Sequence, residues 1–188
     1  MKLHLPFLLR AALAAAVCLP VHAFLDWNGG DWNAEDASWL ENGVSTVFSQ
    51  GDAVVFGAAA ESSLVNITAV VNPGSMVVSS SGYVFTGNGN IAGAAALSLE
   101  SAATLSVLNA NSFSGGTTLG QDSALTLGVY NGVGSVSDSE LALGNIQGSG
   151  RLVIALADAA AQASILGSSL AEFTGTLYIE RGQLGFGR

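Results

Sequence analysis

The chain has 188 residues, of which 24 are glycine, 49% are apolar and only 10% are charged, with a formal net charge of −9. That length fits one domain or two small ones. The high apolar fraction excludes a charge-rich disordered chain, and glycine falls on no three-residue period, which excludes collagen.

Residues 1–23 are predicted to be a signal peptide. They have a basic start, an apolar run over 11–19 and the cleavage box Val21-His22-Ala23. The apolar run is shorter than the roughly 20 residues of a transmembrane helix. Cleavage after Ala23 is favoured over lipidation of Cys18, because Val17 stands where a small residue is needed. We therefore expect an exported chain with no integral membrane segment after cleavage.

The mature chain, residues 24–188, contains no lysine, histidine or cysteine. This excludes Ser-His-Asp and Cys-His catalysis, zinc sites of the usual Cys/His kind, disulfides and a Schiff-base lysine. Three arginines against 14 acidic residues give a formal charge of −11, which repels nucleic acid phosphates. We expect no catalytic, cofactor-binding or metal-binding residues and no nucleic-acid partner.

Residues 24–50 form a Trp-rich lead-in that we interpret as an N-terminal cap. Asp, Asn and Gly separate the indoles and favour turns over regular structure. We interpret all three tryptophans, Trp27, Trp32 and Trp39, as structural core anchors. The alternative is that they are exposed and serve a binding module.

A calcium loop in the lead-in is a weaker hypothesis. Asp31, Asn33 and Glu35 alternate as calcium ligands do, but Asp36 replaces the required glycine and Asn42 the final glutamate.

From residue 51 to 188 the chain reads as a succession of short β-strands. Most alternate apolar and polar residues, which predicts one buried and one exposed side, with Leu125 and Leu127 among the inward residues. The Ala-rich segment 157–170 is the exception and predicts a helical turn or a loop. The expected strands are 54–56, 65–67, 76–78, 83–85, 97–99, 105–107, 125–127, 141–143, 152–154, 177–179 and 184–186.

Degenerate repetition organises these strands. The sequence SFSGGTTL at 112–119 has a weaker copy, EFTGTL, at 172–177, and Phe113 and Phe173 are 60 residues apart, which suggests three turns of about 20 residues. Asn-Gly dipeptides, which favour hairpins, are too few for a meander. We therefore predict a stacked parallel β-solenoid, in which Phe113, Gly115 and Gly116 have structural roles.

Three further stretches carry a family resemblance. GDAVVFG at 51–57, VNPGSMVVSSSGYVFTGNGNIAG at 71–93 and NSFSGGTTLGQDSALTLG at 111–128 make the chain resemble the autotransporter-associated β-strand repeat proteins. The resemblance implies an all-β, single-stranded right-handed parallel β-helix, secretion or surface display in a Gram-negative cell, and no catalytic residues. No translocator follows Arg188, so we expect either the head of a longer protein, whose translocator or anchor lies downstream, or a short secreted relative.

The expected function is therefore a non-catalytic structural passenger, a β-helical stalk for display or adhesion at the outer-membrane surface or outside the cell. Its expected partners are surface glycans or host and neighbouring proteins. Two alternatives stay open: a secreted carbohydrate- or protein-binding module, and a polysaccharide-active enzyme that uses paired carboxylates. The enzyme would draw on acidic residues whose turn-like surroundings are typical of solvated carboxylates. These are Asp122, Asp138, Glu140 and Asp158.

Overall fold

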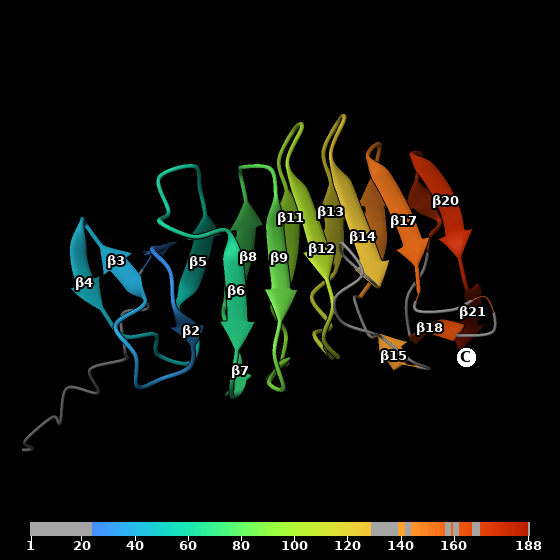
Figure 1. Ribbon diagram of the computed structural model, residues 1–188. Helices are drawn as coiled ribbons and strands as arrows, with labels where there is room; N and C mark the ends of the chain where they lie inside the picture. The colour runs from blue at the N-terminus through green and yellow to red at the C-terminus, as the bar shows by residue number, and fades with distance from the viewer. Residues whose placement is uncertain are drawn as a thin grey trace, which may run out of the picture.

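The computed structural model describes residues 24–128, 139–141, 144–156, 159, 162–166 and 170–187, and of the side chains at 139–141, 162–166 and 186–187 nothing is described. The predicted signal peptide, residues 1–23, lies outside the described residues. Within the described ranges every regular element is a β-strand and there is no helix. The strands stack side by side from the N-terminal to the C-terminal end of the molecule (Figure 1). This confirms the all-β prediction.

A nine-stranded sheet, here called sheet A, forms one side of the stack. Its strands from β1 to β19 pair in parallel, and two antiparallel strands extend it beyond β1. The parallel strands are β1 (Phe24–Trp27), β5 (Ala53–Phe56), β8 (Ser75–Val78), β11 (Ala96–Leu99), β13 (Thr117–Leu119), β16 (Ile146–Gly148) and β19 (Glu172–Phe173), and the antiparallel strands are β3 (Trp39–Glu41) and β4 (Val44–Thr46).

A seven-stranded parallel sheet, here called sheet B, lies in front of sheet A in Figure 1. Along the chain its strands alternate with the parallel strands of sheet A. They are β2 (Asp31–Trp32), β6 (Leu64–Ile67), β9 (Tyr83–Thr86), β12 (Thr104–Val107), β14 (Ala124–Gly128), β17 (Arg151–Ala155) and β20 (Thr176–Arg181).

Short parallel strands form a third side. They follow most strands of sheet B, and in those layers one passage of the chain runs through sheet A, sheet B and the third side. No third-side strand lies between β2 and β3 or between β12 and β13. These strands are β7 (Val70–Val71) paired with β10 (Asn90–Ile91), and β15 (Ser139–Leu141), β18 (Gln162–Leu166) and β21 (Gln183–Gly187) in a sheet of their own. This arrangement is compatible with a β-helix.

The layers differ in length. Leu97 of β11 pairs with Thr117, 20 residues further on, whereas Thr117 pairs with Ile146, 29 residues further on. The expected spacing of about 20 residues therefore holds for some layers and fails for others. The described strands stay in parallel register in both layers.

The core lies between the sheets and is built from columns of register partners. One column runs through sheet A from β1 to β16 and is buried in each of these strands, with Thr117 taking a position that apolar residues hold elsewhere. Its members are Leu25, Val54, Met76, Leu97, Thr117 and Ile146. Parallel strands stack at about 4.8 Å, so each such column is a continuous apolar contact along the molecule.

Two local predictions are wrong. The Ala-rich segment 157–170 contains the strand β18, which pairs in parallel with β15 on one side and β21 on the other. Alanine's helix propensity is a weak preference, and pairing with two neighbouring strands overrides it. Residues 24–50 also hold four short strands rather than turns alone. Asn42 and Gly43 form the tight turn of the β3–β4 hairpin with positive φ angles of 52° and 79°, as type I′ turns require.

The supposed sequence copies do not occupy equivalent places. Thr117 and Leu119 belong to β13 of sheet A, whereas Thr176, in the weaker copy, begins β20 of sheet B. Phe173 pairs with Gly148, which pairs with Leu119, so Phe173 is not the counterpart of Phe113. Glycine followed by threonine and leucine favours any turn that leads into a strand, and each layer has several such turns.

Candidate functional site

The three tryptophans lie inside the N-terminal end of the core. Their exposed fractions are 2% for Trp27 and 0% for Trp32 and Trp39. The Trp27 Nε1–H donates a hydrogen bond to the Ser62 carbonyl oxygen at 2.7 Å, whereas the other two indole N–H groups have no hydrogen-bond partner. Their ring faces are packed against other aromatic rings, so in this structure they form no exposed platform for a ligand.

The residues of the hypothetical calcium loop are hydrogen-bonded to one another and to the next layer. Asn33 Oδ1 accepts from the backbone N–H groups of Glu35 and Asp36, both at 2.8 Å, which is an Asx-type turn. Asp31 Oδ1 accepts from Asn66 Nδ2 at 2.8 Å. No group of three acidic, histidine or cysteine residues that could hold a metal ion occurs among the described residues.

The remaining predicted structural residues fall in the core or at its corners. Phe113, Leu125 and Leu127 are buried. Gly116 has a φ angle of 98°, which favours glycine. A Cβ atom on Gly115 would lie 2.4 Å from two backbone carbonyl oxygens of the preceding layer, so a side chain there requires the backbone to shift.

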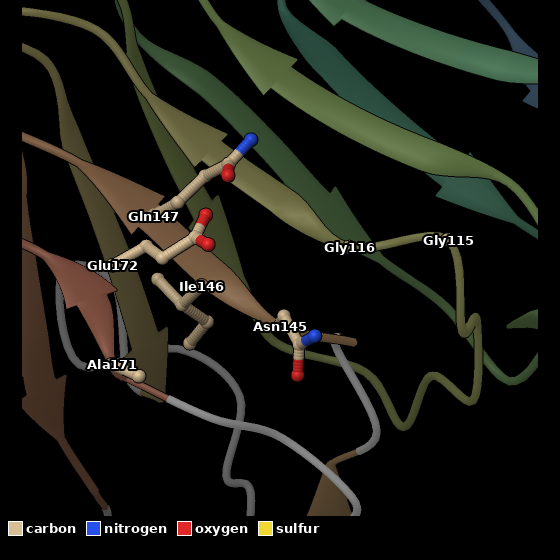
Figure 2. Close-up of a pocket in the computed structure, with 7 residues that line it drawn as sticks. All are labelled: Gly115, Gly116, Asn145, Ile146, Gln147, Ala171 and Glu172. Carbon is tan, nitrogen blue, oxygen red and sulfur yellow. The ribbon is translucent and has the colours of Figure 1, made fainter.

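These two glycines also line a surface pocket of about 440 Å³. It lies where three successive layers turn into β13, β16 and β19 of sheet A (Figure 2). The lining consists of Gly115, Gly116, Asn145, Ile146, Gln147, Ala171 and Glu172. The pocket is therefore built from turns at the corners of the stack. The sequence analysis did not identify its lining residues Asn145, Ile146, Gln147, Ala171 and Glu172 as a site.

The chemistry of the pocket is polar with one ionisable group. Gln147 and Glu172 are register partners and project side by side from neighbouring strands (Figure 2). Gln147 Nε2 donates to Thr118 Oγ1 at 2.8 Å. Two amides and one carboxylate can hydrogen-bond a hydroxylated ligand. They do not supply the acid and nucleophile pair of a glycosidase, which needs two carboxyl groups.

The four carboxylates proposed for an enzyme are only partly described. Asp122 lies in the turn before β14 with a left-handed φ of 58°, and it is exposed. Asp138 and Asp158 lie outside the described residues, and of Glu140 only the backbone in β15 is described. The structure thus places Asp122 in a solvated turn and brings no second described carboxylate of this set beside it.

Arg151 and Tyr178 are brought together on the outer face of sheet B. The guanidinium carbon of Arg151 lies 5.8 Å from the Tyr178 ring centroid, within the range of a cation–π contact. The contact with Tyr178 follows from the register of β17 and β20, in which Tyr178 pairs with Val153, and only the alignment of the two strands could have shown it.

The comparisons with known proteins identify no relative. No family model, no curated protein and no solved structure matches this chain. Across the described ranges no helix has the length and apolar character needed to cross a lipid bilayer.

Proposed function

We propose that the protein is a non-catalytic structural passenger of an autotransporter-like surface protein, a stalk for display or adhesion. One observation carries this proposal, namely the parallel register that continues through sheets A and B from layer to layer. A stack in which each layer contacts only its neighbours grows in one dimension. Such a shape suits a spacer better than it suits a buried active site.

The finer architecture belongs to the same proposal. It consists of a signal peptide at residues 1–23, a Trp-rich cap at 24–50 and a single-stranded right-handed parallel β-solenoid at 51–188. The resemblance of residues 51–57, 71–93 and 111–128 to autotransporter-associated repeats supports it. The parallel pairing of the described strands is compatible with such repeats.

The outer surface of sheet A favours a role in adhesion or display rather than in catalysis. In its outward column Ser98, Thr118 and Gln147 are uncharged polar side chains in register, between the apolar Val77 on one side and Glu172 on the other. Polar ladders of this kind present hydrogen-bonding groups at regular spacing to a glycan or a protein. We therefore propose surface glycans or neighbouring proteins as partners, bound without turnover.

Localisation and intact mass test the proposal. The native product is followed in cell-envelope and medium fractions with an antibody raised against residues 24–188, and its mass is measured. We expect a species far larger than the 18.9 kDa precursor in the envelope fraction, anchored through a downstream segment. A species slightly below that mass, free in the medium, would overturn the stalk and favour a secreted binding module. Retention in the cytoplasm with residues 1–23 attached would overturn export itself.

A further inference from the structure

The surface pocket at the corner of sheet A is hollow because several residues around it are small. Gly115 and Gly116 have no side chain, and Ala171 has only a methyl group. The backbone requires both glycines, since Gly116 has a φ angle of 98° and a Cβ atom on Gly115 would meet backbone carbonyl oxygens of the preceding layer. The hollow of about 440 Å³ is therefore built into the layer corners, and its volume is typical of small-molecule sites.

Polar side chains stand at the margin of this hollow. Gln147 and Glu172 are both exposed, and the Glu172 carboxylate lies beside the Gln147 amide (Figure 2). The Gln147 Nε2 group donates one hydrogen bond to Thr118 Oγ1 at 2.8 Å, so its second N–H and its Oε1 atom can bind a ligand. Glu172 is the one charged side chain among the seven described residues of the lining.

These polar side chains face outward from the sheet. Thr118, Gln147 and Glu172 are successive register partners in the outward column of sheet A, whereas Ile146, which precedes Gln147, belongs to the buried column. A strand added beside β19 would lie in the plane of sheet A. A longer stack would therefore leave Gln147 and Glu172 facing solvent.

The chemistry of this margin selects an uncharged ligand with hydroxyl groups. Residues 24–188 have 14 acidic residues and three arginines, and the described lining adds a carboxylate and no cation, so an anionic ligand is repelled. The Gln147 amide both donates and accepts hydrogen bonds, as a sugar hydroxyl does. An ammonium group only donates, and it would leave the second N–H of Gln147 unused.

We propose that the pocket binds one uncharged sugar residue of a surface glycan, with two neighbouring ring hydroxyls donating hydrogen bonds to the Glu172 carboxylate. The two carboxylate oxygens accept a pair of donors side by side, and hydrogen bonds to a charged group are stronger than neutral ones. Gln147 binds a further hydroxyl of the same sugar. This inference rests on the proposed binding of surface glycans and names the place where such a glycan is held.

Saturation-transfer NMR on the protein expressed from the full chain tests the ligand class. The neutral probes are the methyl glycosides of glucose, galactose and mannose, which together present both trans and cis pairs of neighbouring ring hydroxyls. The charged probes are methyl glucuronide and Nα-acetyl-lysine amide. We expect at least one neutral glycoside to bind, and to bind more tightly than either charged probe. No transfer to any of the three glycosides, or tighter binding of a charged probe than of the best glycoside, overturns the proposed sugar site.

Two variants of the carboxylate test the hydrogen-bonding group. Glu172→Ala is expected to weaken binding of the best glycoside at least tenfold. Glu172→Gln is expected to weaken it less, because the amide keeps one acceptor oxygen. Glu100→Ala removes an exposed carboxylate from the turn after β11 and is the matched control, with binding equal to that of the wild type. Wild-type binding by Glu172→Ala overturns the proposal.

A steric variant tests the hollow itself. Ala171→Phe fills the pocket without removing a polar side chain, and it is expected to abolish binding of the glycosides. Ala59→Phe, in the exposed turn after β5, is the matched control and is expected to bind as the wild type does. Wild-type binding by Ala171→Phe overturns the proposal. If circular dichroism shows that one pocket variant has lost its β-structure, the other variant decides.

The NMR result and the localisation experiment fail separately. Glycoside binding that survives both Glu172→Ala and Ala171→Phe overturns the pocket but leaves glycan adhesion by another surface standing. A product retained in the cytoplasm overturns the surface passenger, whereas the ligand class of the pocket is still decided by the three glycosides.

Discussion

Trp27 and Trp39 lie opposite each other in the antiparallel β1–β3 pair, and their indole rings meet edge to face with centroids 4.9 Å apart. Trp32 packs edge to face against Trp39 at 5.2 Å. Such arrangements place the positive ring edge against the negative ring face. The N–H groups of Trp32 and Trp39 lack hydrogen-bond partners, and both indole rings pack against other aromatic rings. The cluster fills the N-terminal end of the core, where the parallel layers begin.

The first prediction concerns this tryptophan cluster. Iodide is expected to quench tryptophan emission weakly in the folded protein and strongly in urea, because the described structure buries all three indoles. Trp39→Ala is expected to lower the free energy of unfolding by about 3–5 kcal/mol, measured by urea denaturation. The control Phe24→Ala, at a 77% exposed position, is expected to change it by less than about 0.5 kcal/mol. Strong quenching of the native protein would contradict the buried cluster.

The second prediction separates the two sides of β14. Leu125 is fully buried, and its neighbour Thr126 faces outward in the same strand. Leu125→Asp places an unpaired carboxylate in the core, at a cost of several kcal/mol, so we expect loss of cooperative unfolding and of secretion. Thr126→Asp is the matched control and is expected to keep β-rich circular dichroism and nearly wild-type stability. Equal behaviour of the two variants would contradict the inward placement of Leu125.

Alternation of apolar and polar residues predicted the position of most long strands. The segment 54–56 lies within β5, 105–107 within β12 and 152–154 within β17. In each, two large apolar residues at period 2 supply a buried side, and that pattern is local in the sequence. Of the predicted segment 141–143 only Leu141 is described, in β15.

Strands without two large apolar residues were not predictable in this way. In β13 the core position before Leu119 is held by Thr117, which is buried although it is polar. The alanines around β18 favour a helix, and only the pairing of β18 with β15 and β21 shows that it is a strand. The pocket at Gln147 and Glu172 depends on register between residues 25 positions apart, and the variable layer length hides that register from any fixed sequence period.

The third prediction tests the corner before β13. Gly116 has φ of 98°, and a Cβ atom there would lie 3.2 Å from the Asn145 carbonyl oxygen. Gly116→Ala is expected to cost about 1–2 kcal/mol of unfolding free energy because an L residue is strained in this region, and Gly116→Val is expected to cost more. Gly57→Ala is the control, since its Cβ would meet only Ser79 Oγ at an ordinary 3.7 Å. A melting temperature of Gly116→Val equal to that of the wild type would contradict the predicted backbone strain at Gly116.

The fourth prediction concerns stability at high pH. Tyr83 is buried, and its hydroxyl donates to the Gly57 carbonyl oxygen at 2.6 Å. Burial raises the pKa of Tyr83 above its ordinary value of 10.0. The folded state therefore holds this proton more tightly than the unfolded state, so the contribution to stability is complete below pH 10 and is lost as pH rises through the folded pKa.

Residues 24–188 contain no lysine or cysteine, so no side chain of those two types among them contributes to a fall in stability at alkaline pH. Urea denaturation between pH 8 and 12 is expected to show a fall in unfolding free energy that begins near pH 10. Tyr83→Phe is expected to lose about 1 kcal/mol at pH 8 with the hydrogen bond, but to show a much shallower fall above pH 10. The exposed Tyr178→Phe serves as the control and is expected to retain the steep fall. Parallel curves for wild type and Tyr83→Phe would show that the alkaline loss arises elsewhere.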